Sequence, residues 1–188
     1  MYLTTVERVP SNRTLPKTSD VLLIVGTGNT VWDDVEEFWD FEIPHDVCCI
    51  NRVGIVFPCN FAYWYSIHTE DLCLKWWAKD KSPTVQLHGR FVNDSVVQEN
   101  LTCYKYPSLF NGATSSFDAA VIAILCWGYT KIVLAGVPLN KGYQWILPCI
   151  CRAAPKVLHF SEKVRSMSGN TAKLFGKPTK EWLWQPFS

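Results

Sequence analysis

Apolar and polar stretches alternate along the chain in a pattern that predicts strands separated by helices. Several apolar runs have the length and the β-branched content of buried strands. These runs are Val21–Val25, Val47–Ile50, Phe61–Ile67, Val85–Leu87 and Lys131–Ala135. Two further short strands are expected at Cys103–Tyr106, which precedes Pro107, and at Val157–Phe160.

Helical patterns occupy the intervals between these runs. The expected helices are Val31–Trp39, about Thr69–Ala78, Ser115 to about Trp127, about Thr171–Phe175 and about Thr179–Leu183. The third is almost entirely apolar, which indicates burial on most of its sides, and Gly128 ends it. A loop is expected around Pro148 and Pro155. The alternation predicts an α/β fold of the Rossmann-like, doubly wound type, with a mainly parallel sheet.

Length and composition favour a single folded domain. The chain has 188 residues, of which 48% are hydrophobic and 19% are charged, and this balance argues against disorder. Residues 1–20 are polar and are expected to form an N-terminal arm or an edge element, so that residues 21–188 make up the α/β domain. The net charge of +1 provides no basic excess for a nucleic-acid partner.

The eight cysteines are not placed like a disulfide set or a zinc knuckle. Cys48 and Cys49 are adjacent in a predicted strand, and Cys149 and Cys151 are separated by one residue. We therefore expect reduced thiols that pack as small core residues in a cytoplasmic protein. No signal peptide or run of transmembrane length is visible, so no membrane partner is expected. No metal is predicted, because no Asp-x-Asp pair follows a predicted strand.

Four polar segments are expected to meet where the predicted strands end. They are Gly26–Thr30, Asn51–Arg52, His68 and Asn111–Ser116. In parallel α/β sheets, ligands bind beyond the carboxyl ends of the strands, where helix N-termini point. The Gly-Thr-Gly turn is the first candidate for a nucleotide or a phosphate. It lacks the third glycine of the dinucleotide fingerprint and the Gly-Lys-Ser/Thr of a P-loop.

Most of these segments also have a structural interpretation. The helix start at Thr114–Ser116 directs hydroxyls and amides outward, which suits an anion, but Ser115 and Asp118 also fit a capping box. Asn51 suits a ribose hydroxyl or a base edge, or else a turn with a local backbone bond. Arg52 is either a phosphate partner or a solvated surface charge.

Two histidines are candidates for a general base. His68 ends a strand, and His159 lies near Arg165; each is alternatively a residue without a catalytic role. Arg165 opens the polar segment 165–171, whose hydroxyls and glycine suit the wrapping of a phosphate. The alternative is a helix-capping loop in which Arg165 pairs with Glu162.

Four motifs occur in an order that resembles two known families. They are Val25-Gly26-Thr27-Gly28-Asn29, Cys49-Ile50-Asn51-Arg52, Gly112-Ala113-Thr114-Ser115-Ser116, and Gly-Tyr-Thr-Lys-Ile-Val-Leu-Ala-Gly-Val at 128–137. The chain resembles bacterial sialyltransferases of the Campylobacter type and archaeal-type hydroxymethylpterin pyrophosphokinase-like domains. Those families open with Gly-Asn-Gly-Pro-Ser and end the last motif with aspartate, and this chain departs from both features. The C-terminal segment 164–183 is similar to uncharacterised phage and prophage proteins.

The resemblance implies a Rossmann-like domain that holds a cytidine nucleotide in these turns. Carried over residue by residue, the nucleotide contacts fall on Gly26, Thr27, Gly28, Asn51, Thr114 and Ser115. Our leading hypothesis adds Asn29 and Ser116. It describes a phage-encoded glycosyltransferase with no cofactor beyond its nucleotide or nucleotide-sugar ligand. His68 or His159 would be the base, and Arg165 would stabilise the leaving phosphate.

Two other functions fit the same sequence. One is a non-enzymatic phage protein that sequesters a nucleotide signal in the same cleft, where no base is needed. The other is a structural or interaction protein with a vestigial cleft, whose aromatic C-terminus, Trp182–Phe187, is its working surface and a contact for a homo-oligomer. Nucleotide affinity separates the last function from the first two, and turnover separates the transferase from the binder.

Overall fold

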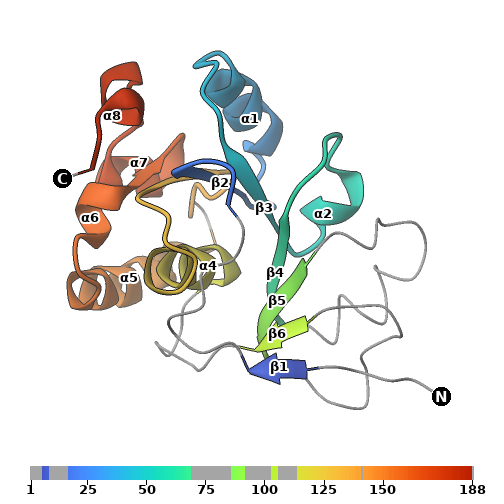
Figure 1. Ribbon diagram of the computed structural model, residues 1–188. Helices are drawn as coiled ribbons and strands as arrows, with labels where there is room; N and C mark the ends of the chain where they lie inside the picture. The colour runs from blue at the N-terminus through green and yellow to red at the C-terminus, as the bar shows by residue number, and fades with distance from the viewer. Residues whose placement is uncertain are drawn as a thin grey trace.

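The computed structural model describes residues 6–8, 17–68, 86–91, 103–105, 114–140 and 142–187 (Figure 1). Its strands are β1 (Val6–Arg8), β2 (Val21–Val25), β3 (Asp46–Ile50), β4 (Tyr63–His68), β5 (Gln86–Phe91), β6 (Cys103–Lys105), β7 (Lys131–Ala135) and β8 (Val164–Ser166). Its α-helices are α1 (Val31–Trp39), α2 (Val53–Val56), α4 (Ser115–Leu125), α5 (Leu147–Ala153), α6 (Phe160–Lys163), α7 (Gly169–Phe175) and α8 (Lys180–Trp184). Two 3₁₀ helices, η2 (Gln144–Ile146) and η3 (Ala154–Lys156), flank α5.

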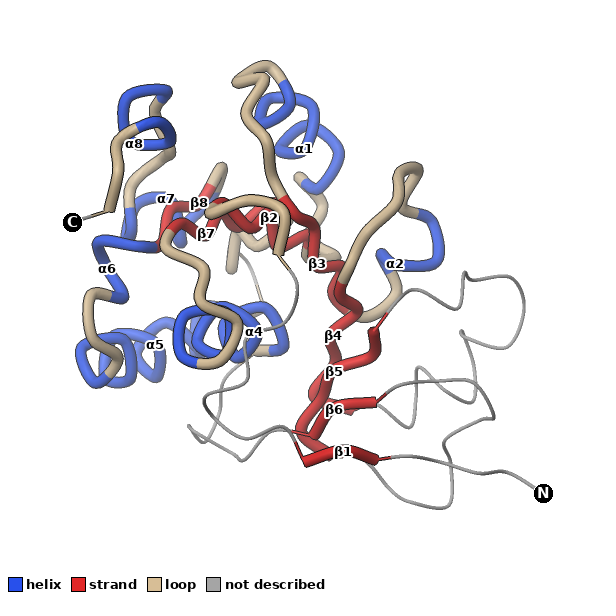
Figure 2. The backbone as a smooth tube through the Cα atoms, in the orientation of Figure 1, coloured by secondary structure: helices blue, strands red, loops and turns tan. Residues whose placement is uncertain are grey.

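The eight described strands form one parallel sheet in the order β1-β6-β5-β4-β3-β2-β7-β8 (Figure 2). From β2 the chain adds strands on one side, from β3 to β6, and then returns beside β2 to add β7 and β8. The two halves meet where Val21 pairs with Lys131 and Val25 pairs with Ala135. The sheet is therefore doubly wound, as the sequence predicted, and its switch point lies between β2 and β7.

Helices cover both faces of this sheet (Figure 1). Alternate residues of β2 point to opposite faces of the sheet. Leu22 and Ile24 pack in the core under α4, and Leu23 and Val25 pack in the core under α1. Residues 119–123 of α4 are fully buried, which confirms the predicted buried helix. Among the residues described, no helix combines the length and the apolar character needed to cross a membrane.

The core contains aromatic rings and thiols in its central strands. Trp64 and Trp127 are fully buried, and the Trp127 ring stacks on Tyr63 with a centroid distance of 4.5 Å. Cys48 and Cys49 are buried in β3. Burial raises the pKa of the Cys48 thiol well above its usual value, so that thiol stays protonated near neutral pH.

Several predicted elements coincide with the structure and one is wrong. The bounds of β2, α1 and β7 are those expected, and β1 pairs with β6 at the edge of the sheet. The predicted strand Val157–Phe160 is absent from its place; the last described strand is β8, some residues later. The stretch around Pro148 and Pro155, expected as a loop, contains α5 and η3. The helix expected at about 69–78 lies outside the described residues.

The strand at 157–160 fails because its apolar residues anchor a turn. Val157 and Phe160 are buried, whereas Leu158 between them is 75% exposed. A spacing of three residues between buried side chains suits a helical turn, whereas a strand buries every second residue. His159 has φ of 58°, which is incompatible with a strand, and α6 begins immediately after it.

Asp46 is the centre of a polar cluster at the start of β3. It accepts hydrogen bonds from the Thr18 amide at 2.9 Å and from the Tyr129 hydroxyl at 2.7 Å, and Tyr129 shares a 3.0 Å hydrogen bond with the Tyr63 hydroxyl. Burial raises the pKa of Asp46, but these bonds, with others from the Thr18 hydroxyl and the Ser19 amide, outweigh it. The net pKa of Asp46 therefore lies below its usual value.

We expect Asp46→Asn to destabilise the fold near neutral pH and to flatten its acid dependence. Because folding lowers the pKa of Asp46, its carboxylate contributes stability that is present above the pKa of the unfolded chain. That contribution is lost as the pH falls through the folded-state pKa. Urea unfolding from about pH 7 to about pH 2 measures the slope. Asp40→Asn, at an exposed carboxylate after α1, is the control, and a wild-type slope in Asp46→Asn would contradict the expectation.

Candidate functional site

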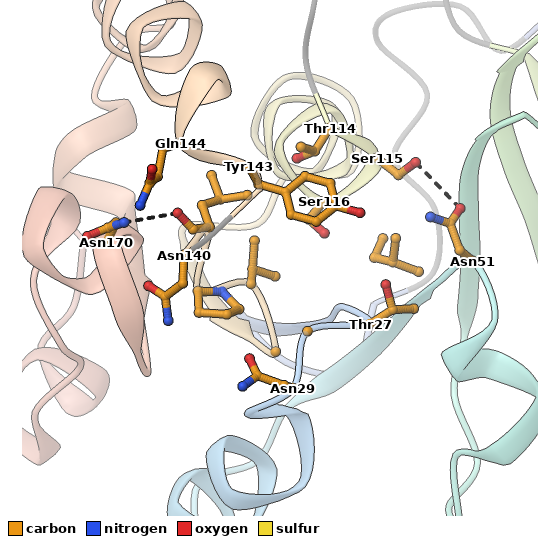
Figure 3. Close-up of a pocket in the computed structure, with 16 residues that line it drawn as sticks. Thr27, Asn29, Asn51, Thr114, Ser115, Ser116, Asn140, Tyr143, Gln144 and Asn170 are labelled. Atoms are coloured by element: carbon orange, nitrogen blue, oxygen red, sulfur yellow. Dashed lines mark hydrogen bonds between the residues drawn. The ribbon is translucent and has the colours of Figure 1, made fainter.

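A pocket of about 820 Å³ opens at the carboxyl edge of the sheet, at the switch point (Figure 3). Its walls are the turns after β2 and β7, the end of β3, and the starts of α4 and α7. The lining residues are Thr27, Gly28, Asn29, Ile50, Asn51, Thr114, Ser115, Ser116, Gly136, Val137, Pro138, Leu139, Asn140, Tyr143, Gln144 and Asn170. All the residues predicted to bind a nucleotide belong to this set except Gly26. The structure thus brings together motifs that are far apart in the sequence.

The glycines after β2 are required by the close approach of the turn after β7. The Gly26 amide donates to the end of β7, and the Gly28 amide donates to the Gly136 carbonyl, each at 2.8 Å. A Cβ on Gly26 or on Gly28 would lie 2.6 Å from the Gly136 carbonyl oxygen. The amides of Gly26 and Gly28 therefore connect the turn after β2 to the end of β7 and the turn that follows it. The side chains of Thr27 and Asn29 from the turn after β2 line the pocket.

Ser115 contacts the Asn51 carboxamide from the first turn of α4. The Ser115 hydroxyl accepts a hydrogen bond from the Ile67 amide at 3.2 Å and donates to Asn51 Oδ1 at 3.5 Å. The Asn51 backbone is also held, because its amide donates to the Tyr65 carbonyl at 3.0 Å and its carbonyl accepts from Trp64 Nε1 at 2.6 Å. With its oxygen turned to Ser115, Asn51 presents its Nδ2 donor on the side of the pocket (Figure 3).

Thr114 is the cap of α4, so the predicted capping box between Ser115 and Asp118 is wrong. The Thr114 hydroxyl accepts a hydrogen bond from the Phe117 amide at 3.2 Å. The Asp118 carboxylate instead accepts from the buried Tyr65 hydroxyl. Because the Thr114 hydroxyl caps the Phe117 amide, the Ser115 hydroxyl is available to link α4 to the ends of β3 and β4.

Asp34 joins three segments that surround the pocket, although it does not line it. Its side chain is 3% exposed, and its Oδ2 accepts from the Gly136 amide at 2.8 Å. The same oxygen accepts from the Ser168 hydroxyl at 2.7 Å and from the Thr30 hydroxyl at 3.0 Å. In the sequence it is one of two adjacent aspartates in the first turn of a predicted helix, and its position three residues after Val31 and four before Phe38 puts it on the apolar face, unlike the exposed Asp33.

The sequence makes the polar segment 165–171 a candidate phosphate loop. In the structure, this segment supports one wall of the pocket. The Thr171 hydroxyl donates to the Val137 carbonyl at 2.5 Å. The Asn170 amide donates to the Pro138 carbonyl at 2.8 Å, and Asn170 Nδ2 donates to the Leu139 carbonyl at 3.0 Å. Three consecutive carbonyls after β7 are therefore fixed by the start of α7.

Two lining residues have backbone conformations that non-glycine residues adopt rarely. The φ angles are 50° at Asn51 and 44° at Leu139. Asparagine enters the left-handed region readily, but for leucine this costs about 1–2 kcal/mol. Such outliers cluster at functional sites, where the surrounding contacts hold them in place. The buried Leu139 is held by its bond from Asn170.

All three predicted catalytic residues lie outside the lining of the pocket. His68 is exposed at the end of β4, next to Ile67, whose amide donates to Ser115. It therefore lies at the same sheet edge as the pocket, outside the lining. His159 and Arg165 are also outside the lining, beside the C-terminal helices.

His159 and Arg165 are engaged with their own neighbourhood. His159 Nδ1 lies 2.9 Å from Glu162 Oε2, so Glu162 pairs with His159 and not with Arg165 as one interpretation expected. Arg165 Nη1 donates to the Ser161 carbonyl at 2.7 Å, and its guanidinium lies 4.9 Å from the centroid of a Trp182 ring. Burial lowers the pKa of Arg165. The aromatic C-terminus thus packs, in part, on its own chain.

The described lining combines polar and apolar side chains and contains no charged one. None of its 16 residues has a carboxylate, an imidazole, an amine, a guanidinium or a thiol. Its carboxamides are Asn29, Asn51, Asn140, Gln144 and Asn170, and its hydroxyls are Thr27, Thr114, Ser115, Ser116 and Tyr143. Within the part of the chain that the structure describes, no group of three His, Cys, Asp or Glu side chains is placed to hold a metal ion.

Sequence reasoning missed the part of the lining formed by Asn140, Tyr143 and Gln144, whereas Asn170 belongs to the polar segment 165–171 that it singled out. The first three follow β7, and Asn170 is in the first turn of α7. Loop carboxamides produce no periodic signal. The available cue was the position of β7 itself, because residues after any strand of a parallel sheet reach the same edge.

Comparisons with family models, with curated proteins and with solved structures found no match. The resemblance to sialyltransferases and to phage proteins therefore stays a prediction. What this site does has to be argued from its own geometry and chemistry.

Proposed function

We propose that this protein binds a nucleotide or a nucleotide-sugar in the pocket between the ends of β2 and β7. The observation that carries the proposal is that Thr27, Asn51 and Ser115, taken from separate motifs, line one pocket at the switch point. Ligands of doubly wound sheets bind at this place, with phosphates toward a helix N-terminus and other groups on side chains at strand ends.

The start of α4 is the end of the pocket suited to phosphate. This helix has 11 residues, and Ser115 and Ser116 in its first turn line the pocket. Helix N-termini carry a partial positive charge and unsatisfied amides, so they hold phosphates without a charged side chain. An uncharged lining is therefore compatible with a phosphate at this position.

Asn51 suits the nucleoside part of the ligand. Because Ser115 takes its Oδ1, Asn51 offers a hydrogen-bond donor, which matches a base carbonyl or a ribose oxygen. Thr27 and Asn29 add a hydroxyl and a carboxamide from the turn after β2. Side chains held in one orientation before binding lose little entropy when the ligand arrives.

The same site supports two functions that differ in turnover. A glycosyltransferase-type reaction needs a base, and His68 is the predicted catalytic residue at this sheet edge. A non-enzymatic nucleotide binder needs none, and the absence of carboxylates and imidazoles from the described lining favours it. A transferase loses turnover in His68→Ala while it keeps its ligand affinity; a binder shows no turnover with any acceptor.

Thermal unfolding of the full chain with nucleotides, nucleotide-sugars and cyclic nucleotides, without added metal, tests the proposal. A ligand at about 100 times its dissociation constant adds about 2.7 kcal/mol to the free energy of unfolding. A shift with one chemical class supports the pocket assignment and identifies its ligand. If a folded sample shows no shift with any nucleotide or nucleotide-sugar, the proposal fails and the interaction-protein hypothesis is favoured.

Ser115→Ala is expected to weaken nucleotide binding about fivefold, or by about 1 kcal/mol, because it removes a pocket hydroxyl and releases the Asn51 carboxamide. Isothermal titration with the nucleotide that gave the largest thermal shift measures the change. Ser161→Ala, at an exposed serine of α6, is the matched control. Equal affinities in Ser115→Ala and the wild type would contradict the assignment of this wall.

A further inference from the structure

The wall after β7 faces the predicted nucleotide residues across the pocket. Asn140, Tyr143 and Gln144 are exposed and line it, and none of them belongs to a motif that suggested nucleotide binding. Figure 3 shows Asn140 and Gln144 on the side of Asn170, with Asn51 and Ser115 on the opposite side. The pocket therefore has a second recognition surface of its own.

This second wall is fixed before any ligand is present. The carbonyls of Pro138 and Leu139 accept hydrogen bonds from Asn170, at 2.8 and 3.0 Å. After the wall, Ile146 is buried and anchors η2 in the core under α4. The described backbone next to the wall is therefore anchored to the fold on both sides.

The chemistry of the wall indicates what it recognises. A carboxamide carries both a donor and an acceptor, so Asn140 and Gln144 match groups that themselves donate and accept, as hydroxyls do. Tyr143 is 59% exposed and adds a flat apolar ring with a hydroxyl. A sugar ring has several hydroxyls and an apolar face of C–H groups.

We propose that Asn140, Tyr143 and Gln144 form a carbohydrate subsite that binds a polyhydroxylated ring. The inference rests on the proposed function for the opposite wall and extends it. The pocket volume of about 820 Å³ lies in the upper part of the range for small-molecule sites, about 300–1,000 Å³, and accommodates a ligand of two linked parts. The ring is either the sugar of a nucleotide-sugar or a separate saccharide.

Isothermal titration of the full chain with UDP and UDP-glucose, CMP and CMP-N-acetylneuraminate, and lactose tests the subsite. We expect one nucleotide-sugar to bind about tenfold more tightly than its own nucleotide, as two added hydrogen bonds allow. In Asn140→Ala/Gln144→Ala this advantage is expected to disappear while the affinity for the nucleotide is unchanged. If the ring comes from a separate saccharide, lactose binds and the double variant loses that binding instead.

Two variants of Tyr143 distinguish ring packing from hydrogen bonding by its hydroxyl, because Tyr143→Phe removes only the hydroxyl and Tyr143→Ala removes the ring as well. If both variants keep the sugar affinity of the wild type, Tyr143 has no role in the subsite. Gln185→Ala, at an exposed carboxamide of the C-terminus, is the matched control. The subsite is overturned if sugars add no affinity, or if the double variant weakens the nucleotide as much as the nucleotide-sugar; the proposed function then stands. If no nucleotide binds but lactose does, the proposed function fails and the subsite is supported. If neither binds, both fall.

Discussion

Gly136→Ala is expected to cost about 3 kcal/mol of folding free energy and to remove the pocket. Gly136 has φ of 65°, where an added Cβ costs about 1–2 kcal/mol. That Cβ would also lie 2.7 Å from the Val31 Cβ and 2.8 Å from the Gly26 carbonyl oxygen. Val31 begins α1 and Gly26 begins the turn after β2, so these atoms move only if the helix and the two turns separate. Urea unfolding and ligand titration measure the two losses.

Gly142→Ala provides the matched control for Gly136→Ala. Gly142 also has positive φ, at 90°, but no atom lies within 4 Å of the position of its Cβ. It therefore carries the conformational cost, about 1–2 kcal/mol, without the collision. The difference in unfolding free energy between the two variants measures the effect of the close approach of the turns. If Gly142→Ala is as destabilising as Gly136→Ala, the contact between the turns is not what requires glycine.

Asp34→Ala is the second substitution with a large expected effect, about 3 kcal/mol. It leaves the buried Gly136 amide without its charged acceptor, and hydrogen bonds to charged groups contribute about 1.5–3 kcal/mol each. The hydroxyls of Ser168 and Thr30 lose the same acceptor, but they lie 2.8 Å apart and remain bonded to each other. Because the turn after β7 loses its connection to α1, we also expect weaker ligand binding.

Two further variants, Asp33→Ala and Asp34→Asn, serve as controls for Asp34→Ala. Asp33→Ala removes a neighbouring carboxylate from the same first turn of α1, so both variants lose a similar interaction with the helix dipole, about 0.3–1 kcal/mol. Asp34→Asn keeps one oxygen acceptor in place and is expected to lose less stability than Asp34→Ala. Urea unfolding compares the three. An equal loss in Asp33→Ala and Asp34→Ala would show that the buried bonds contribute nothing beyond the dipole term.

The parts of the fold that sequence reasoning predicted are those with a repeating local signal. β2 and β7 are short apolar runs bounded by turns, and α1 has acidic residues at its start and an apolar face. β8 was missed because it is short and contains Arg165 and Ser166. Their polar groups are satisfied by residues just outside the strand: the Arg165 guanidinium donates to the Ser161 carbonyl, and the Ser166 hydroxyl lies 2.8 Å from the Thr171 hydroxyl.

The candidate site also contains residues that the sequence predicts and residues that it does not. Thr27, Asn51 and Ser115 follow strands or start a helix, so the topology of a parallel sheet predicts that they meet. Asn140 and Gln144 reach the pocket because α7 fixes the carbonyls after β7, and that contact joins segments about 30 residues apart in the sequence. A tertiary bond of this kind has no signature in either segment alone.

The place of β2 in the sheet has a consequence for synthesis on the ribosome. Val21 pairs on one side with Lys131, so the chain must grow by more than a hundred residues before that side of β2 is covered. Until then an apolar strand presents an open edge, and such edges pair with other chains during slow folding. We therefore expect the nascent chain to be prone to aggregation at this edge until β7 has emerged. The strand that ends at the pocket is therefore also a strand whose edge is open to other chains during synthesis.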